Sequence, residues 1–445
     1  VEPGYLPDAP LFNVPEVWKT SLSNGMEIYG ITHSELPVVQ FTINIRGGLL
    51  MDPPGKEGLS YLNARLMNEG TALRSAEDLE SAMGLLGARI TVSSEVEGVN
   101  VNVTALSRNF AKVVALTEEI LLNPRFDADA LTRIKQETKS LIRQSSANPQ
   151  NIARQTRDML IYGKGSTLSG SVYGTPQSID SISIEDIKAF YERTFSPSLA
   201  TMNIAGNIDK FGCETALATL AKDWKRVEVS VPDVQYGTPA KTGSIYFVDN
   251  PGSPQSMIIV GKRGLSFNNP DFYPATIVNY RLGSGSQGML FDVLRLQRGF
   301  TYGASSSFEA GKYYNNFSAS SSVQASTTPE AVKIFRELIG GYGNTFNEEL
   351  LSETKNSMTK AMASSFETLG SLVKMLSNIS YYNLPEDYVK QHEQILYNMT
   401  LEEAKAVISR NLNINEMVIV VVGDAKTQLK PLEAAGLGKP ILVSR

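Results

Sequence analysis

Residues 183–209, SIEDIKAFYERTFSPSLATMNIAGNID, and residues 400–426, TLEEAKAVISRNLNINEMVIVVVGDAK, follow one pattern. Each stretch opens with Ser or Thr and has an acidic residue three positions later, as in the capping box that starts many helices. An amphipathic run follows, and then an apolar strand that ends at Gly206 in one stretch and at Gly423 in the other. The same offset of 217 positions holds throughout. A repeat of this length indicates that an α+β unit has been duplicated.

Other segments extend the repeat to whole halves of the chain. The strand QFTINIRGG at 40–48 matches QSMIIVGKRG at 255–264, and both halves continue with alternating runs and amphipathic helices. We predict an α+β fold of two homologous domains, each a mostly antiparallel β-sheet of about five to six strands backed by helices. The segment 232–242 contains Pro and Gly and lacks periodicity, so it is predicted to link a domain at 1–231 to one at 243–445.

Composition narrows the functional class. The formal net charge of -5 argues against a general nucleic-acid binder. No run approaches the roughly 18 apolar residues that a membrane span needs. The single cysteine, Cys213, allows no internal disulfide and is expected to be a small buried residue. Few cysteines and a first residue, Val1, that would fit an already removed signal peptide favour the bacterial periplasm, with the cytoplasm as the alternative.

The stretch Gly58–Thr71, GLSYLNARLMNEGT, is predicted to form an amphipathic helix with Tyr61 and Arg65 four positions apart on one face. The only two histidines, His33 and His392, are far apart in the sequence, so no helix can carry the His pair of a zinc site. Both histidines are expected to be ordinary surface residues. No Ser-His-Asp or Cys-His arrangement stands out either, which leaves no familiar catalytic set in the chain.

Three segments resemble one known family. They are the stretch at 58–71, YGTPQSIDSISIEDIKAFYERTFSP at 173–197, and LGSGSQGMLFDVLRLQRGFTYGASS at 282–306. Together they are similar to the insulinase, pitrilysin and mitochondrial-processing-peptidase family, the zinc peptidases with the inverted His-x-x-Glu-His motif. The resemblance covers nearly the whole chain.

The resemblance implies that the catalytic residues of the first half are lost. The first zinc His of the family falls on Tyr61, the general base Glu on Ala64, and the second zinc His on Arg65. The third ligand of the family is a Glu on a later helix, where the sequence reads RIKQETKSLIRQSSANP. Glu137 is the only acid there, but an alignment on the closing proline puts Leu141 at the ligand position. This chain is therefore expected to hold no metal, and zinc is expected in a partner subunit.

In the second half the family residues remain. Family members carry an Arg and a Tyr, seven positions apart, that bind the substrate backbone and help polarise the scissile carbonyl, and Arg295 and Tyr302 match them. The alternative is a surface Arg and a Tyr in a strand. Gly283, Gly285 and Gly288 match a glycine-rich segment that faces the substrate cavity in non-catalytic processing-peptidase subunits, and are predicted to bind substrate. The alternative is a turn between two helices.

The resemblance therefore suggests a non-catalytic subunit of a heterodimeric bacterial zinc metallopeptidase, inactive alone. Its partner would be a homologous subunit with the His-x-x-Glu-His motif, and the two would bind an extended peptide between them. Residues 88–94 match the edge strand that pairs with substrate in active members. The alternative is a non-enzymatic peptide-binding or scaffold protein, possibly homodimeric. The sequence does not indicate which peptide is cleaved or where.

Overall fold

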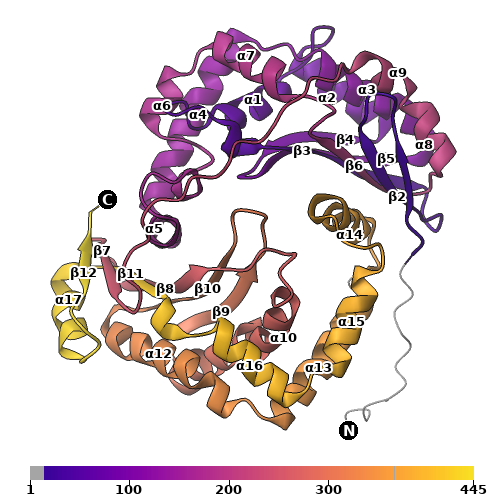
Figure 1. The fold of residues 1–445 in the computed structure, drawn as a ribbon. Coiled ribbons are helices and arrows are strands. Elements are labelled where there is room, and N and C mark those ends of the chain that lie inside the picture. Colours follow the sequence, from indigo (N-terminus) through magenta and orange to yellow (C-terminus); the bar gives the residue numbers. More distant parts are fainter. Residues whose placement is uncertain (1–14, 365, 445) are drawn as a thin grey trace.

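The computed structural model describes residues 15–364 and 366–444 and has two six-stranded sheets that face each other across the molecule (Figure 1). Helices cover the outer side of each sheet. The predicted α+β fold, two similar sheets backed by helices, is confirmed. None of the described helices is both long enough and apolar enough to cross a membrane.

The first half contains six strands and nine α-helices within the described residues. The strands are β1 (Trp18–Ser21), β2 (Glu27–Thr32), β3 (Val38–Arg46), β4 (Arg89–Ser94), β5 (Gly98–Leu106) and β6 (Ala200–Gly206). The helices are α1 (Leu59–Met67), α2 (Ala76–Leu86), α3 (Phe110–Leu122), α4 (Ala128–Ala147), α5 (Pro149–Tyr162), α6 (Pro176–Ser181), α7 (Ile184–Thr194), α8 (Lys210–Ala216) and α9 (Ala218–Asp223). Residues 224–244 then lead to the second half without helix or strand.

The second half repeats this order. Its strands are β7 (Ile245–Asp249), β8 (Gln255–Arg263), β9 (Thr301–Glu309), β10 (Asn316–Gln324), β11 (Val418–Gly423) and β12 (Ile441–Val443). Its helices are α10 (Phe272–Gly283), α11 (Met289–Phe291), a π-helical turn (Asp292–Gln297), α12 (Thr328–Thr345), α13 (Glu348–Ser364), α14 (Leu369–Tyr382), α15 (Tyr388–Asn398), α16 (Leu401–Asn411) and α17 (Ala425–Ala434).

The two sheets share one strand order, β1-β2-β6-β3-β5-β4 in the first and β12-β7-β11-β8-β10-β9 in the second. Pairing is antiparallel except for β2 with β6, β7 with β11, and β12 with β7. The edge strands β4 and β9 occupy equivalent places. The sheets differ at the opposite edge. The first sheet ends there with β1, which precedes its other strands in the chain, whereas the second ends with β12, which follows its other strands.

The strand register corrects one part of the predicted repeat. Phe41 of β3 lies opposite Ile204, and Ile258 of β8 lies opposite Val421. Both pairs are related by 217 positions, the offset of the longer repeat. The predicted match of 40–48 with 255–264 is therefore wrong by two residues. A two-residue shift leaves every side chain on the same face of a strand, so the apolar pattern did not reveal the error.

Each half lends one helix to the other sheet. The apolar face of α5, including Ile152 and Ile161, packs against Val248, Ile259 and Val420 of the second sheet in one buried cluster. In return α14 covers the inner face of the first sheet, as Figure 1 shows, through a second cluster of buried residues. The exchange hides an apolar face of each sheet from water and fixes the two halves against each other.

Two single residues complete the comparison with the sequence. Cys213 is buried, as predicted, and burial raises the pKa of its thiol to about 12. His392 is half-buried and not fully exposed as expected, because its ring stacks on Tyr273 with centroids 3.9 Å apart. Burial lowers the pKa of His392 to about 4. His33 lies just beyond β2 and is half-buried.

Candidate functional site

Helix α1 begins where the chain turns sharply at Gly58, which has φ +95. The carboxylate of Asp52 accepts hydrogen bonds from the backbone N–H groups of Gly58, Leu59 and Ser60, at 2.8 to 3.1 Å. These are orphan donors of the first helical turn, and a negative charge at this end also complements the helix dipole. Asp52 therefore anchors the start of the helix that carries the degenerate motif.

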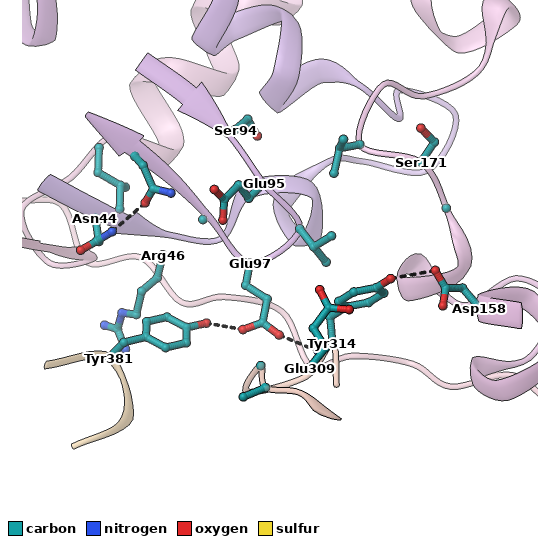
Figure 2. A pocket seen from close by; sticks show the side chains of 18 of the residues that line it. Asn44, Arg46, Ser94, Glu95, Glu97, Asp158, Ser171, Glu309, Tyr314 and Tyr381 are labelled. Atoms are coloured by element: carbon teal, nitrogen blue, oxygen red, sulfur yellow. Dashed lines mark hydrogen bonds between the residues drawn. The ribbon is translucent and has the colours of Figure 1, made fainter. Parts of the chain in front are cut away.

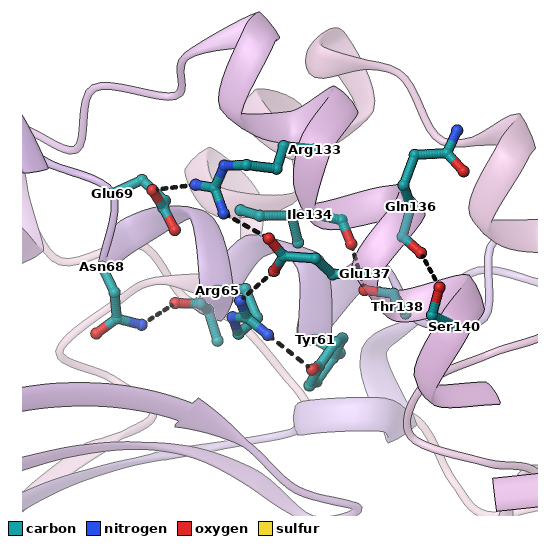
Figure 3. Close-up of polar contacts among 11 residues, drawn as sticks. Tyr61, Arg65, Asn68, Glu69, Arg133, Ile134, Gln136, Glu137, Thr138 and Ser140 are labelled. Carbon is teal, nitrogen blue, oxygen red and sulfur yellow. Dashed lines mark hydrogen bonds and ion pairs between the residues drawn. The ribbon is translucent and has the colours of Figure 1, made fainter. Parts of the chain in front are cut away.

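A chain of polar contacts fills the space where α1 faces α4 (Figure 3). Arg65 donates to the Tyr61 hydroxyl at 3.2 Å and to Glu137 at 3.0 Å. Arg133 donates to the other oxygen of Glu137 at 2.7 Å and to Glu69 at 2.5 Å. Arg133, and after it Arg65, hold the pKa of Glu137 below its usual value. Two guanidinium groups and two carboxylates thus balance each other between the helices.

These residues do not fit a zinc ion. Arg65 carries a fixed positive charge, Ala64 is buried and has no polar group, and Tyr61 offers a hydroxyl already bonded to Arg65. Of the two residues weighed on α4, the structure brings Glu137 to Arg65, while Leu141, one turn further along, is partly exposed. Within the described ranges, no three His, Cys, Asp or Glu side chains gather as a metal site would need.

Beside this helix a cavity of about 560 Å³ opens between the two halves (Figure 2). Tyr173 links the two features, because it lines the cavity and its ring meets that of Tyr61 edge to face at 4.9 Å. Ser94 at the end of β4 also lines the cavity and bonds Ser60 of α1. Most of the wall comes from β3, the β4–β5 turn, α5, the 170–173 loop, the end of β9 and α14.

The floor of the cavity holds a carboxylate that the sequence analysis missed. Glu97, in the β4–β5 turn, accepts hydrogen bonds from the backbone N–H groups of Lys312, Tyr313 and Tyr314 in the β9–β10 loop, at 2.5 to 3.0 Å. The hydroxyl of Tyr381 on α14 donates to it at 2.6 Å (Figure 2). The Glu97 side chain of the first half therefore holds both the β9–β10 loop and α14 of the second half.

A second polar group joins the halves beside it. Arg157 and Asp158 of α5 form a buried ion pair at 2.7 Å, and the Tyr314 hydroxyl donates to Asp158 at 2.8 Å. Burial raises the pKa of Asp158, while Arg157 acts in the opposite direction. The sequence could not reveal this cluster, because Tyr314 lies more than 150 positions away from Arg157 and Asp158 in the chain.

The predicted pair of the second half lies outside the residues that line this cavity. Arg295 is in the π-helical turn, with its guanidinium carbon 4.8 Å from the centre of the Phe291 ring. Tyr302 is in β9 and is 87% exposed. In the part of the chain that the structure describes, neither the Arg295 guanidinium nor the Tyr302 hydroxyl has a hydrogen-bond or ionic partner. Both therefore present free donors to solvent.

The predicted glycines have packing roles of their own. A Cβ on Gly283 would overlap Ser306 of β9, and one on Gly288 would come 2.7 Å from the Cα of Gly283. Only Gly285 has free space around it, and it adopts a positive φ of +54. The close approach of backbone segments explains Gly283 and Gly288. Substrate binding by the three glycines remains a prediction.

Comparisons with known proteins agree with this description. A model of the insulinase family, peptidase family M16, matches residues 31–175, and a model of the peptidase M16 inactive domain matches residues 181–358. The chain is 19% identical over 420 residues to the non-peptidase homolog YmxG of Helicobacter pylori, covering 90% of this chain and 96% of that one. It is 21% identical over 277 residues to the mitochondrial-processing peptidase subunit beta of Blastocladiella emersonii, covering 62% and 58%. A crystal structure of a peptidase M16 inactive domain from Pseudomonas fluorescens superposes with a TM-score of 0.85, at 22% identity, over 92% of this chain and 98% of that chain.

Proposed function

The chain belongs to the insulinase family, peptidase family M16, as an inactive member, and from this we propose that it is the non-catalytic subunit of a heterodimeric zinc metallopeptidase. The proposed partner is a homologous subunit with an intact His-x-x-Glu-His motif. In the pair, the zinc of the partner polarises the scissile carbonyl and activates water. This chain binds part of an extended peptide and contributes Arg295 and Tyr302.

The contrast between two arginines carries the proposal. Arg65 on α1 has its guanidinium committed to Tyr61 and Glu137. Arg295 has one face on Phe291 and, within the described residues, no hydrogen-bond partner. An arginine held by an aromatic ring keeps its planar fork of donors available for carbonyl or carboxylate oxygens. Tyr302 is 87% exposed on a strand, so its ring and hydroxyl are open to a partner or ligand.

The chemical role of the pair follows from its donors. We assign the Arg295 guanidinium to peptide carbonyl oxygens, where its fork of N–H groups fixes the position of the backbone. We assign the Tyr302 hydroxyl to the carbonyl oxygen that gains negative charge when the bond is attacked. Loss of one such donor lowers kcat by about 100-fold to 1,000-fold in well-studied cases.

The first half supports peptide binding in this proposal. Strand β4 lies at the edge of its sheet, so one row of its backbone N–H and C=O groups has no strand beside it. An extended peptide can add itself to such an edge. The cavity of about 560 Å³ begins at Ser94, where β4 ends, and has room for side chains of a peptide bound there.

The test is reconstitution with the His-x-x-Glu-His homologue from the same organism and an assay of peptide cleavage. The partner alone should be nearly inactive, and the pair should be active with zinc only in the partner. In the pair, Arg295→Ala and Tyr302→Phe should each reduce kcat by at least about tenfold.

Two matched controls keep the test specific. Arg298 is exposed in the same segment but pairs with Glu330 at 3.2 Å, and Tyr397 is 59% exposed on α15. Arg298→Ala and Tyr397→Phe should leave cleavage unchanged. A fully active partner alone, or unchanged turnover with Arg295→Ala and Tyr302→Phe, would overturn the proposal. A stable homodimer that binds no such partner would favour a scaffold role instead.

A further inference from the structure

Two departures from regular backbone geometry lie close together on the surface of the second half. The π-helical turn Asp292–Gln297 carries Arg295, and the first residues of β9 form a β-bulge that carries Tyr302. We propose that both irregularities are held in place by dedicated side chains, with Phe291 as the positioning residue for Arg295 and Thr301 as the positioning residue for Tyr302. This inference rests on the proposed function, because it concerns how the two donors are aimed.

The bulge is visible in the strand register. Ser321 of β10 lies opposite Ala304 of β9, but Val323 lies opposite Thr301, so β9 has one more residue than β10 across this interval. The extra residue falls at Tyr302 or Gly303. Bulges occur often at sheet edges, where they change the direction of a side chain, and β9 is an edge strand.

The Thr301 hydroxyl lies at the centre of the hydrogen bonds across the bulge, and the Ser321 hydroxyl also contacts the Gly303 carbonyl at 2.9 Å. Thr301 Oγ1 accepts a hydrogen bond from the backbone N–H of Gly303 at 3.1 Å and one from the hydroxyl of Ser321 at 3.0 Å. It lies 2.6 Å from the carbonyl oxygen of Ser322, to which it can donate. The residues on either side of Tyr302 are therefore tied to each other and to β10. Between these fixed neighbours, the Tyr302 side chain is 87% exposed to solvent.

The π-helical turn is held by different contacts. The N–H of Arg298 donates to the carbonyl of Val293, five positions earlier, at 3.1 Å. Leu294 is fully buried inside the turn while Arg295 next to it is exposed. The Phe291 ring then lies 4.8 Å from the guanidinium carbon. Because Arg has several rotatable bonds, a ring against one face reduces the entropy lost when the fork binds a ligand. π-helical turns are frequent at functional sites, in keeping with this role.

The alternative explanation is that these residues only stabilise the fold. Phe291 and Thr301 are both half-buried, so each could serve packing alone. A positioning role predicts a loss in kcat with little change in KM or thermal stability, because a donor aimed wrongly weakens the transition state more than the bound peptide. A purely structural role predicts lower thermal stability without a specific loss in kcat.

The experiment uses the reconstituted pair with the full chain. Thr301→Val removes the hydroxyl and keeps the branched shape, and Phe291→Leu removes the ring. Each should lower kcat by about tenfold with KM within about twofold, since small misplacement of a catalytic group has large effects. Thr301→Ser and Phe291→Tyr should restore kcat, because they return the hydroxyl and the ring. In a Tyr302→Phe background, Thr301→Val should have no further effect on kcat.

Different outcomes separate this inference from the function it rests on. If Tyr302→Phe and Arg295→Ala are themselves silent, the proposed function fails. If these two variants lose activity while Thr301→Val and Phe291→Leu keep wild-type kcat, only the positioning inference fails. Should Thr301→Val not fold, Ser321→Ala removes a hydroxyl that lies within hydrogen-bond distance of both Thr301 Oγ1 and the Gly303 carbonyl, and it is expected to lower kcat in the same direction. Wild-type kcat in that variant would likewise reject the role of Thr301.

Discussion

The pH dependence of stability should reveal the buried imidazole of His392. Its ring lies flat against Tyr273 and meets Tyr388 edge to face at 5.3 Å, so a positive charge on it would be poorly solvated. Burial accordingly lowers its pKa from 6.5 to about 4. The folded protein then favours the neutral ring, whereas the unfolded chain takes up a proton near pH 6.5.

The sign and the size follow from this difference. The contribution of His392 to stability is complete above pH 6.5 and is lost as the pH falls from 6.5 towards 4. Between a pKa of 6.5 and one of about 4, the full loss is about 3.4 kcal/mol. At pH 5 about 2 kcal/mol of it should already be lost. Partial solvent access to the ring makes these figures upper values.

Two measurements check this prediction. Selective ¹³C labelling of histidine gives two imidazole signals, since the chain has two histidines, and His33→Gln assigns them. The His392 signal should titrate near pH 4. In urea unfolding, His392→Phe should lose about 2 kcal/mol less than wild type between pH 7.5 and pH 5, while His33→Gln should behave as wild type. A His392 signal that titrates near pH 6.5 would refute the reasoning.

Three further substitutions test other contacts. Arg65→Met should lower the free energy of unfolding by about 1 kcal/mol in urea titrations, because its partners are partly exposed, and a loss above about 3 kcal/mol would contradict this. Glu97→Gln should lower it by about 2 kcal/mol and speed proteolytic cleavage between the halves, whereas Glu95→Gln in the same turn should do neither. Gly283→Ala should destabilise strongly through its overlap with β9, while Gly285→Ala should cost about 1 kcal/mol, and equal thermal shifts for the two would refute the packing account.

Local sequence signals predicted the repeated elements well. The capping boxes at Ser183 and Thr400 are both formed, and the helices they start run over equivalent residues, 184–194 and 401–411. These features depend on residues within one turn of helix, which a sequence displays directly. The residue-by-residue match of β3 with β8 depends on strand partners far away in the chain, and there the prediction was wrong by two residues.

The sequence did not predict which helix packs against which sheet. The amphipathic patterns of α5 and α14 show that each helix has a face to bury, but not that each buries it on the sheet of the other half. The contacts of Glu97 and of His392 could not be predicted from the sequence either. Both residues look like ordinary surface residues in a linear sequence. The exchanged helix α14 and the β9–β10 loop surround Glu97, whereas the packing of α15 on α10 within the second half surrounds His392.

The degenerate motif on α1 and the pair Arg295 and Tyr302 differ in whether their polar groups are free. On α1, position 65 holds a guanidinium that pairs with Glu137 of α4, and the charges between the two helices balance each other. This pairing links α1 to α4 beside the edge strand and the cavity. In the second half, Arg295 and Tyr302 sit on braced backbone irregularities and offer free donors. The proposed role, a subunit without zinc that serves the active site of its partner, accounts for both observations.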